Sequence, residues 1–288
     1  AATATTNYNV AVGALAGTSV TTGQYNTLLG GLAGDALTTS NNNVAIGYQA
    51  LTTDTLGTKT VAVGVDALKT QNFTTNTDTY NVAMGYHAGR DITTGYLNTI
   101  VGGQAGDAFT DGSANVAIGT KAISADTRGS RSIAIGRDAL QTQNFSSTQT
   151  NTFNIAIGDK AGEAVTIGLY NTLVGGLAGD ALTDTDGNVA IGYNALTSET
   201  TGHGSTAVGY EALKNQNVAG AASTSNVAVG YNAGKLIASA TLNTAVGALA
   251  LDAEVNGHRN TAIGYGALST QSSGTSTNSN NVGVGYHA

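Results

Sequence analysis

The sequence predicts an all-β fold, a repetitive parallel β-roll or β-solenoid of sixteen coils. The first observation is a short motif that recurs along all 288 residues, with NVAIGYQAL at 43–51 as one copy. The second is its even spacing. Successive motif glycines, such as Gly30 and Gly47, lie 17 residues apart, and after every three or so such spacings one is longer by four or five residues. The third is the composition, with 40 glycines, no proline and only 10% charged residues. Such repeats predict stacked units that share one core.

The motif glycines index the coils. The first eight are Gly13, Gly30, Gly47, Gly64, Gly85, Gly102, Gly119 and Gly136, and the others are Gly158, Gly175, Gly192, Gly209, Gly230, Gly247, Gly264 and Gly285. The ordinary coil is thus seventeen residues long. We treat residues 1–288 as a single β-roll segment of a longer fibre. Its superrepeats lie at about 9–80, 81–153, 154–225 and 226–280, with a partial one at 281–288. The fourth superrepeat has one coil fewer than the first three.

Each motif predicts a short strand just before its glycine. All sixteen coils carry Val, Ile or Thr three residues before the glycine, and Val, Ile, Leu or Met one residue before it. The residue between them is Ala in twelve coils, and the exceptions are Leu28, Ile100, Leu173 and Gly283. A strand with two apolar faces must be buried on both sides. So short a coil can cover one face itself, and we expect another copy of the chain to cover the small Ala/Gly face.

Two further positions are predicted to be structural. Alanine follows the glycine by three residues in every coil, as at Ala50 and Ala67, where a tight corner suits a small side chain. Asn precedes the glycine by four residues in thirteen coils, as at Asn43 and Asn81. Stacked side-chain amides can bond to one another as a ladder. Residues that recur in every coil are expected to hold the solenoid together rather than to form a binding site.

Composition excludes several classes of function. The absence of cysteine excludes a disulfide scaffold and suits an extracellular protein. With 11 Lys+Arg against 18 Asp+Glu, the net charge of −7 has the wrong sign for a nucleic-acid partner. No apolar run approaches the roughly 18 residues of a membrane span, so we expect no membrane insertion in this segment. The four histidines lack metal-ligand spacing and no nucleophile–His–acid set can be assembled, so we expect no enzyme, metal or cofactor site.

One short motif is similar to a calcium-binding sequence. GGLAGD at 30–35 and its copies resemble the nonapeptide GGxGxD. The copies begin at Gly30, Gly102 and Gly175 rather than every nine residues, so adjacent turns could not share one ion. Asp35, Asp107 and Asp180 are therefore predicted to be turn or surface residues.

The uniform pattern breaks in the fourth coil of each superrepeat, where four or five residues are inserted. The polar stretches that contain them are 69–80, 141–153, 214–225 and 269–280. They are either receptor loops with avidity for a repeating surface glycan or insertions tolerated at a solvated edge. The candidate receptor residues are Gln71, Asn72, Phe73, Gln143, Asn144, Phe145, Gln216 and Asn217. Asn72 and Asn144 also begin glycosylation sequons.

The twelve tyrosines are tied to the repeat. Seven directly follow a motif glycine, and five lie five or six residues before one. Such an aromatic stripe could stack against sugar rings or pack over the coil edges, and both interpretations are kept.

The NVAIGxxA pattern resembles the head repeats of trimeric autotransporter adhesins, the YadA-like heads, and the similar NTAVGYxAL repeats of bacteriophage tail fibres. The resemblance covers essentially the whole chain. It implies a left-handed β-roll in which three chains lie side by side and form a fibre that binds surfaces. The segment shows no stalk, neck or membrane anchor, so the resemblance does not separate a phage fibre from a bacterial adhesin.

Together these observations predict a structural and adhesive fibre segment. We expect a rigid homotrimeric rod outside the cell, on a virion or a cell-surface appendage, that supports attachment to a cell-surface glycan or receptor. One alternative is a purely structural extracellular filament or sheath without a specific receptor. A less favoured alternative is an ice-binding solenoid, because Thr21 lies eight residues after its glycine whereas Thr52 lies five after, and the threonines therefore keep no register.

Overall fold

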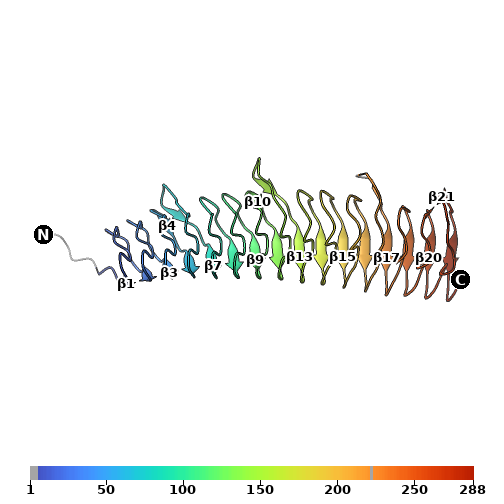
Figure 1. Cartoon of the computed structure of the whole chain (residues 1–288), viewed down its shortest axis with the longest axis horizontal. Coiled ribbons are helices and arrows are strands. Elements are labelled where there is room, and N and C mark those ends of the chain that lie inside the picture. Colours follow the sequence, from blue (N-terminus) through green and yellow to red (C-terminus); the bar gives the residue numbers. More distant parts are fainter. Residues whose placement is uncertain (1–5, 221–222) are drawn as a thin grey trace. The chain divides into compact units, whose positions relative to one another are not determined.

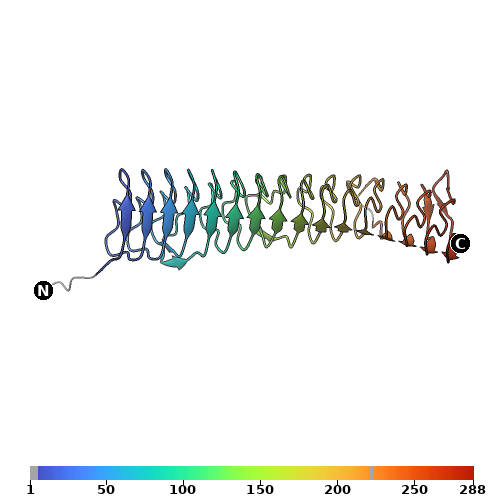
Figure 2. The ribbon, with the colours of Figure 1, turned by 90° about the horizontal axis from the view of Figure 1, so that it is seen from below.

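The computed structural model describes residues 6–220 and 223–288 and shows an all-β, parallel solenoid of about sixteen turns (Figures 1 and 2). The repeat-based prediction of the fold class is thereby confirmed. Within this described part no helix occurs, and so none has the length and apolarity to cross a bilayer. The chain divides into two compact units. The first comprises the described residues up to Ala134 with Asn144–Asn151, and the second Ile135–Gln143 with the described residues from Thr152 on.

Every coil contributes a three-residue strand that ends one residue before the motif glycine, as predicted. In the first unit these are β1 (Val10–Val12), β2 (Thr27–Leu29), β3 (Val44–Ile46), β5 (Val61–Val63), β7 (Val82–Met84), β8 (Thr99–Val101) and β9 (Val116–Ile118). In the second unit they are β13 (Ile155–Ile157), β14 (Thr172–Val174), β15 (Val189–Ile191), β16 (Thr206–Val208), β17 (Val227–Val229), β18 (Thr244–Val246), β20 (Thr261–Ile263) and β22 (Val282–Val284). Strand β11 (Ile133–Ile135) includes residues of both units.

Neighbouring strands pair in parallel, and the register places each motif position beside its own copy one coil later. In the pair β3–β5, for example, Val44 lies opposite Val61 and Ala45 opposite Ala62. Among the described residues, three of the inserted loops each form a two-stranded ladder with the coil that precedes them. These are β4 (Gly57–Thr58) with β6 (Thr77–Asp78), β10 (Gly129–Ser130) with β12 (Thr150–Asn151), and β19 (Gly257–His258) with β21 (Thr277–Asn278).

The strands turn their small face inward, which corrects the expectation about their two faces. The central alanine of each internal strand, such as Ala45 or Ala62, lies fully buried inside its own coil. The flanking residues at both outer positions are half-buried or exposed in every coil. The prediction that another chain covers the Ala/Gly face is therefore wrong. The coil is narrow, so only a small side chain fits opposite the return stretch, and the bulky residues point outward.

The core is filled by a large side chain at one of two positions, either four or seven residues after the motif glycine. Leu51, four residues after its motif glycine, is fully buried. Where Gly34 stands at this position, Leu37 three residues later fills the space, and a Cβ on Gly34 would lie 2.8 Å from the side chains of both Leu37 and Leu28. Leu28 replaces the usual central alanine because its side chain lies against glycines at this position, at Gly17 and Gly34.

The motif glycine is required by the close stacking of successive coils. Gly230 has a φ of +139°, and a Cβ there would lie 2.6 Å from the carbonyl carbon and oxygen of Gly247, the next motif glycine. The same collision with the next coil's backbone occurs at Gly47. A side chain would therefore push the coils apart at this corner, besides forcing a backbone conformation that L-residues avoid.

The buried Asn row bonds mainly to the backbone of the next coil, rather than amide to amide as expected. The Oδ1 atom of Asn43 accepts from the backbone amide of Thr60 at 2.9 Å, and its Nδ2 donates to the carbonyl of Gly57 at 3.0 Å. Asn81 bonds in the same way to Asn98 and Gly95. Each asparagine thus satisfies two backbone groups of the next coil from inside the solenoid, which explains why the residue recurs.

Candidate functional site

The first inserted loop is anchored from inside by a buried carboxylate that sequence reasoning missed. Asp54 is fully buried. Its Oδ1 accepts from the backbone amides of Gly57 at 3.0 Å and Phe73 at 3.2 Å, and its Oδ2 accepts from Nε2 of Gln71 at 2.6 Å. The other amide atom of Gln71, Oε1, accepts from Nδ2 of Asn81 at 2.8 Å. We call the carboxylate, the glutamine and the two backbone donors the carboxylate clasp, because together they fix the start of the loop against the preceding coil.

The buried carboxylate recurs once in each of the four superrepeats. The four carboxylates are Asp54, Asp126, Glu199 and Glu254, and the glutamines at the same position of the following coils are Gln71, Gln143, Gln216 and Gln271. In the third superrepeat, Glu199 accepts from the amides of Gly202 at 2.7 Å and Val218 at 3.3 Å, and from Nε2 of Gln216 at 2.9 Å. All eight residues lie seven after a motif glycine. Comparison of this one position across the coils would have identified the clasp, because the other coils carry an apolar residue there.

The pKa of the buried carboxyl is shifted in opposite directions in the first and fourth superrepeats. Burial raises the pKa of the Asp54 carboxyl, and the hydrogen bonds from Gln71, Gly57 and Phe73 oppose this effect only in part. Burial acts in the same direction on Glu254, but there the hydrogen bonds outweigh it and the pKa lies below its ordinary value. The longer glutamate reaches more donors, since its Oε1 alone accepts from four backbone amides.

The structure buries half of the candidate receptor residues. The buried ones are Gln71, Gln143, Gln216 and Phe73. These four side chains are therefore not exposed for contact with a receptor in this structure, and Gln71 and Gln216 are held by the buried carboxylates. Asn72 and Phe145 are half-buried, whereas Asn144 and Asn217 are exposed. The accessible parts of the first two loops are their tips, residues 74–76 and 146–149.

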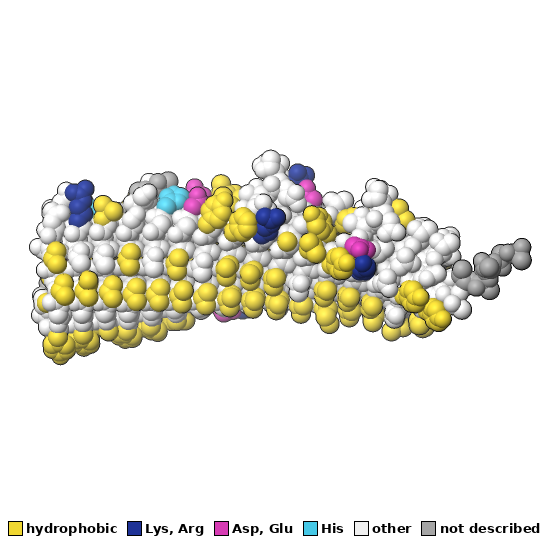
Figure 3. All heavy atoms as spheres, turned by 180° about the vertical axis from the view of Figure 1, so that it is seen from behind, with side chains coloured by type: hydrophobic (Ala, Val, Ile, Leu, Met, Phe, Trp, Pro, Cys, Tyr) yellow, Lys and Arg dark blue, Asp and Glu magenta, His cyan; other side chains and the backbone are white. Residues whose placement is uncertain are grey.

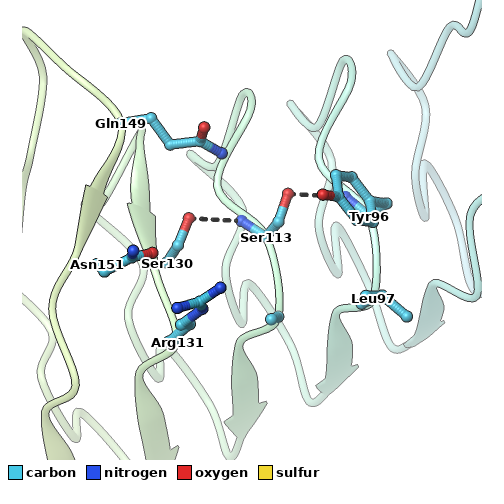
Figure 4. A pocket seen from close by; sticks show the side chains of 8 residues that line it. Tyr96, Leu97, Ser113, Ser130, Arg131, Gln149 and Asn151 are labelled. Carbon is cyan, nitrogen blue, oxygen red and sulfur yellow. Dashed lines mark hydrogen bonds between the residues drawn. The ribbon is translucent and has the colours of Figure 1, made fainter.

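A groove of about 290 Å³ lies beside the second inserted loop, within the first unit (Figure 4). Its polar lining consists of Tyr96, Ser113, Ser130, Arg131, Gln149 and Asn151. The two serines come from successive coils and are almost fully buried, and Ser130 lies opposite Asn151 in the β10–β12 ladder. Ser130 Oγ accepts from the backbone amide of Ser113 at 3.0 Å, and Ser113 Oγ accepts from that of Tyr96 at 3.2 Å. The groove thus combines three coils and the loop strand.

The wall of the groove is held by contacts of the second loop. The side-chain amide of Gln149 donates to the carbonyl oxygen of Asp111 at 2.8 Å. The Asp111 carboxylate lies 3.8 Å from the guanidinium of Arg128. Arg131 is the charged residue in the lining, and none of the lining residues is Asp or Glu. The groove therefore offers amide, hydroxyl and guanidinium groups together with one aromatic ring, that of Tyr96, which is 45% exposed.

A second candidate surface is the outward side of the strands. We call it the valine–isoleucine face and define it as the residues three and one before each motif glycine. It carries no charged residue, and Figure 3 shows hydrophobic side chains in rows that repeat from coil to coil. Clearly exposed members include Val12, Leu29, Met84, Ile157, Ile191 and Ile263. An uncharged apolar surface that repeats in every coil is typical of an association surface.

Tyrosines flank this face and stack on one another. Rings of Tyr193, Tyr210 and Tyr231 follow one another in successive coils, with centroids 5.8 and 5.5 Å apart. Each is about half exposed. The rings therefore pack over the coil edges while still offering faces to a partner or a ligand.

Several charged side chains form local ion pairs. Glu211 accepts from Lys214 and Lys235, each at 2.6 Å, and these bonds lower its pKa to about 2. Asp35 and Asp180 accept from threonines of the next coil, as expected for turn or surface residues. In the part of the chain that the structure describes, no three His, Cys, Asp or Glu residues are grouped as a metal site.

Comparisons with protein-family models, with curated proteins and with solved structures found no match.

Proposed function

We propose that the chain is a structural and adhesive fibre segment in which three copies associate through the valine–isoleucine face. The observation that carries the proposal is the exposure of this face: both of its positions are half-buried or exposed in every coil, and neither is ever charged. Burying such side chains in an interface is favourable by roughly 25 cal/mol per Å². The extracellular location on a virion or cell-surface appendage, and the number three, follow from the resemblance to adhesin heads and phage fibres.

A second copy of the chain is the partner that fits this face best. The register repeats valine beside valine and isoleucine beside valine from one coil to the next, as between β3 and β5. A partner must therefore present apolar groups at the same repeat along its length. A copy of the same chain in register does so at every coil. Closed symmetry then lets each chain cover the face of its neighbour.

The mass of the folded chain tests this proposal. By sedimentation equilibrium at neutral pH we expect three times the chain mass of 28.6 kDa. The double variant Ile191→Glu/Val208→Glu places charges on the face in adjacent coils and should lower the mass, because a buried unpaired charge costs several kcal/mol. Asn215→Glu, at an exposed loop position, is the matched control and should keep the wild-type mass. A wild-type chain that sediments as a stable monomer would contradict the proposal.

The adhesive role is tested at the loop tips. Whole loops should not be deleted, because residues such as Gln71 and Phe73 are part of the core. Instead, residues 74–76 and 146–149 are replaced by Gly and Ser, and binding to a glycan array is compared with that of the wild-type chain. Loss of binding at unchanged mass supports attachment through the loops. Binding that stays unchanged would favour a structural filament without a receptor in these loops.

A further inference from the structure

We infer that neighbouring chains of the proposed fibre interlock along the two edges of the valine–isoleucine face. The inference rests on the association proposed above, for which it names the contact that sets the register. We define the leading row as the residues five before each motif glycine and the trailing row as the residues directly after it. The leading row of one chain packs against the trailing row of a second copy, coil against equivalent coil, in the head-to-tail manner of a closed ring.

Both rows carry large side chains that lie exposed on the single chain. Those of the leading row are Tyr8, Tyr25, Tyr80, Leu97, Phe153, Tyr170 and Leu242. Those of the trailing row are Tyr48, Tyr86, Tyr193, Tyr210, Tyr231, Tyr265 and Tyr286. Each of these side chains is at least 45% exposed, so contact with a second copy would remove much apolar surface from water.

The sizes of the residues in the two rows are matched coil by coil. Five coils carry glycine in one of the rows, and the other row then carries a large side chain in every case. These pairs are Tyr25 with Gly31, Leu97 with Gly103, Tyr170 with Gly176, Gly187 with Tyr193, and Gly204 with Tyr210. In twelve of the sixteen coils one row, and not the other, carries Tyr, Phe or Leu. Only one coil, with Tyr80 and Tyr86, has large side chains in both rows.

The match does not come from contacts inside one chain. Beyond its chain neighbours, a Cβ added to Gly103 would meet no described residue within 4 Å, so Leu97 of the same coil does not reach it. A Cβ on Gly187 would be equally free, although Tyr193 belongs to its coil. Tyr193 stacks instead on Tyr210, which follows it along the trailing row. Residues whose sizes are matched without contact in one chain are expected to meet in an interface between chains.

The match is best when equivalent coils face each other. A shift by one coil brings large side chains together at three levels, Tyr25 with Tyr48, Tyr170 with Tyr193, and Leu242 with Tyr265. The opposite shift does so at two levels, Leu97 with Tyr86 and Leu242 with Tyr231, and leaves Gly187 against Gly176. Facing large side chains overpack an interface, whereas facing glycines leave a cavity. The sizes therefore favour the register of equivalent coils.

Disulfide crosslinking tests the inference on the complete chain, which has no cysteine of its own. Leu97→Cys/Gly103→Cys places thiols in facing positions at one level. After oxidation, we expect the main band on a non-reducing denaturing gel to shift from one to three times the chain mass of 28.6 kDa. Tyr80→Cys/Gly103→Cys and Ala114→Cys/Gly103→Cys are the matched controls, each one coil out of level. One coil adds about 4.8 Å, which takes a Cα separation of about 5.5 Å to about 7.3 Å, beyond the reach of a disulfide. The main band of both controls should therefore stay at the chain mass.

A size swap tests the packing itself. Gly103→Tyr fits the single chain, because the space around Gly103 is open, but it would face Leu97 of the neighbouring chain. We expect association to weaken at least about tenfold, measured by sedimentation at the urea concentration that half-dissociates the wild type. Adding Leu97→Gly recreates the kind of pair found at Gly187 and Tyr193 and should restore association. Adding Tyr80→Gly, one coil away, should not.

The outcomes separate this inference from the proposed fibre. Sedimentation equilibrium of the reduced samples reports assembly independently of the crosslink. If the wild-type chain has three times the chain mass but the Leu97→Cys/Gly103→Cys band does not shift, or an out-of-level pair shifts as readily, the inference falls while the fibre proposal stands. If Gly103→Tyr associates as well as the wild type does, the two rows do not pack against each other. A monomeric wild-type chain would overturn the fibre proposal and this inference with it.

Discussion

The geometry of the carboxylate clasp predicts that Asp54→Asn makes the first inserted loop open more easily. Asparagine keeps Oδ1 for the amides of Gly57 and Phe73, but it presents an NH₂ group to Nε2 of Gln71, where Asp54 presents Oδ2. Gln71 cannot flip its amide to adapt, because its Oε1 accepts from Asn81. Two donors then face each other in a buried site.

The magnitude follows from the bonds that change. Loss of a hydrogen bond to a charged group costs about 1.5–3 kcal/mol, and an unsatisfied buried donor adds about 1–3 kcal/mol. Removal of the buried charge offsets part of this cost, since burial already raises the pKa of Asp54. We therefore expect a net loss of about 2 kcal/mol in the free energy of opening the first loop.

Native-state hydrogen exchange is the suitable assay, because a solenoid opens locally and a single global unfolding free energy is poorly defined for it. In Asp54→Asn the amides of residues 57 and 73 should exchange about thirtyfold faster, since about 1.4 kcal/mol corresponds to a factor of ten. The equivalent amides of Gly202 and Val218 in the third superrepeat are the internal control and should be unaffected.

The double variant Asp54→Asn/Gln71→Glu exchanges the two partners. The new NH₂ group donates to the new carboxylate, which can also still accept from Asn81. We expect at least about 1 kcal/mol of the loss to be recovered, which a double-mutant cycle measures directly. If the double variant exchanges as fast as Asp54→Asn, the donor–donor conflict is not the cause. If neither differs from the wild type, the clasp does not hold the loop.

Three further predictions concern single positions. Gly47→Ala should lower the free energy of opening its coil by about 3 kcal/mol or more, measured by native-state hydrogen exchange, because its Cβ meets the next coil's backbone; the Cβ of Gly103→Ala meets nothing within 4 Å, and this variant should be close to neutral. Glu211→Gln should be less stable than the wild type above pH 4.5, the ordinary pKa of a glutamate, and this difference in stability should vanish as the pH falls toward 2. Thermal unfolding at pH 6, 4 and 2 checks this, and an unchanged difference at pH 2 would contradict it. Leu242→Gly should raise the melting temperature, with a gain of about 0.5–1 kcal/mol, because Leu242 is half exposed at a φ of +63° and glycine occupies the same repeat position at residue 187; a lower melting temperature would show that its packing outweighs the strain.

Much of the fold was predictable because the same short motif recurs in every coil. The strand, the motif glycine and the inserted loops all lie where the spacing of residues such as Gly47 and Gly64 places them. The inside of the coil was not predictable from the alternation alone, since both faces of a strand such as Val44–Ile46 are apolar. The width of the coil decides which face of the strand points inward. That width depends on pairs of residues such as Gly34 and Leu37, which are three residues apart.

The candidate site was predictable only as a region. The inserted loops were located correctly, but a glutamine in a polar stretch looks exposed, and Gln71 is buried because Asp54, one coil earlier, supplies its acceptor. The groove has no local signal in the sequence. Its residues lie between positions 96 and 151 and meet only because three coils and a loop strand stack side by side.

The inserted loops also bear on how the chain withstands proteolysis. Residues 74–76 form an exposed tip between β5 and β7, and the two strands are paired to each other directly rather than through that tip. A cut in the tip would sever one covalent link and leave the strand ladder and the Asp54 carboxylate in place. Loops are preferred sites of proteolytic nicking. A nicked chain would therefore run as fragments on a denaturing gel and still hold together in its native state.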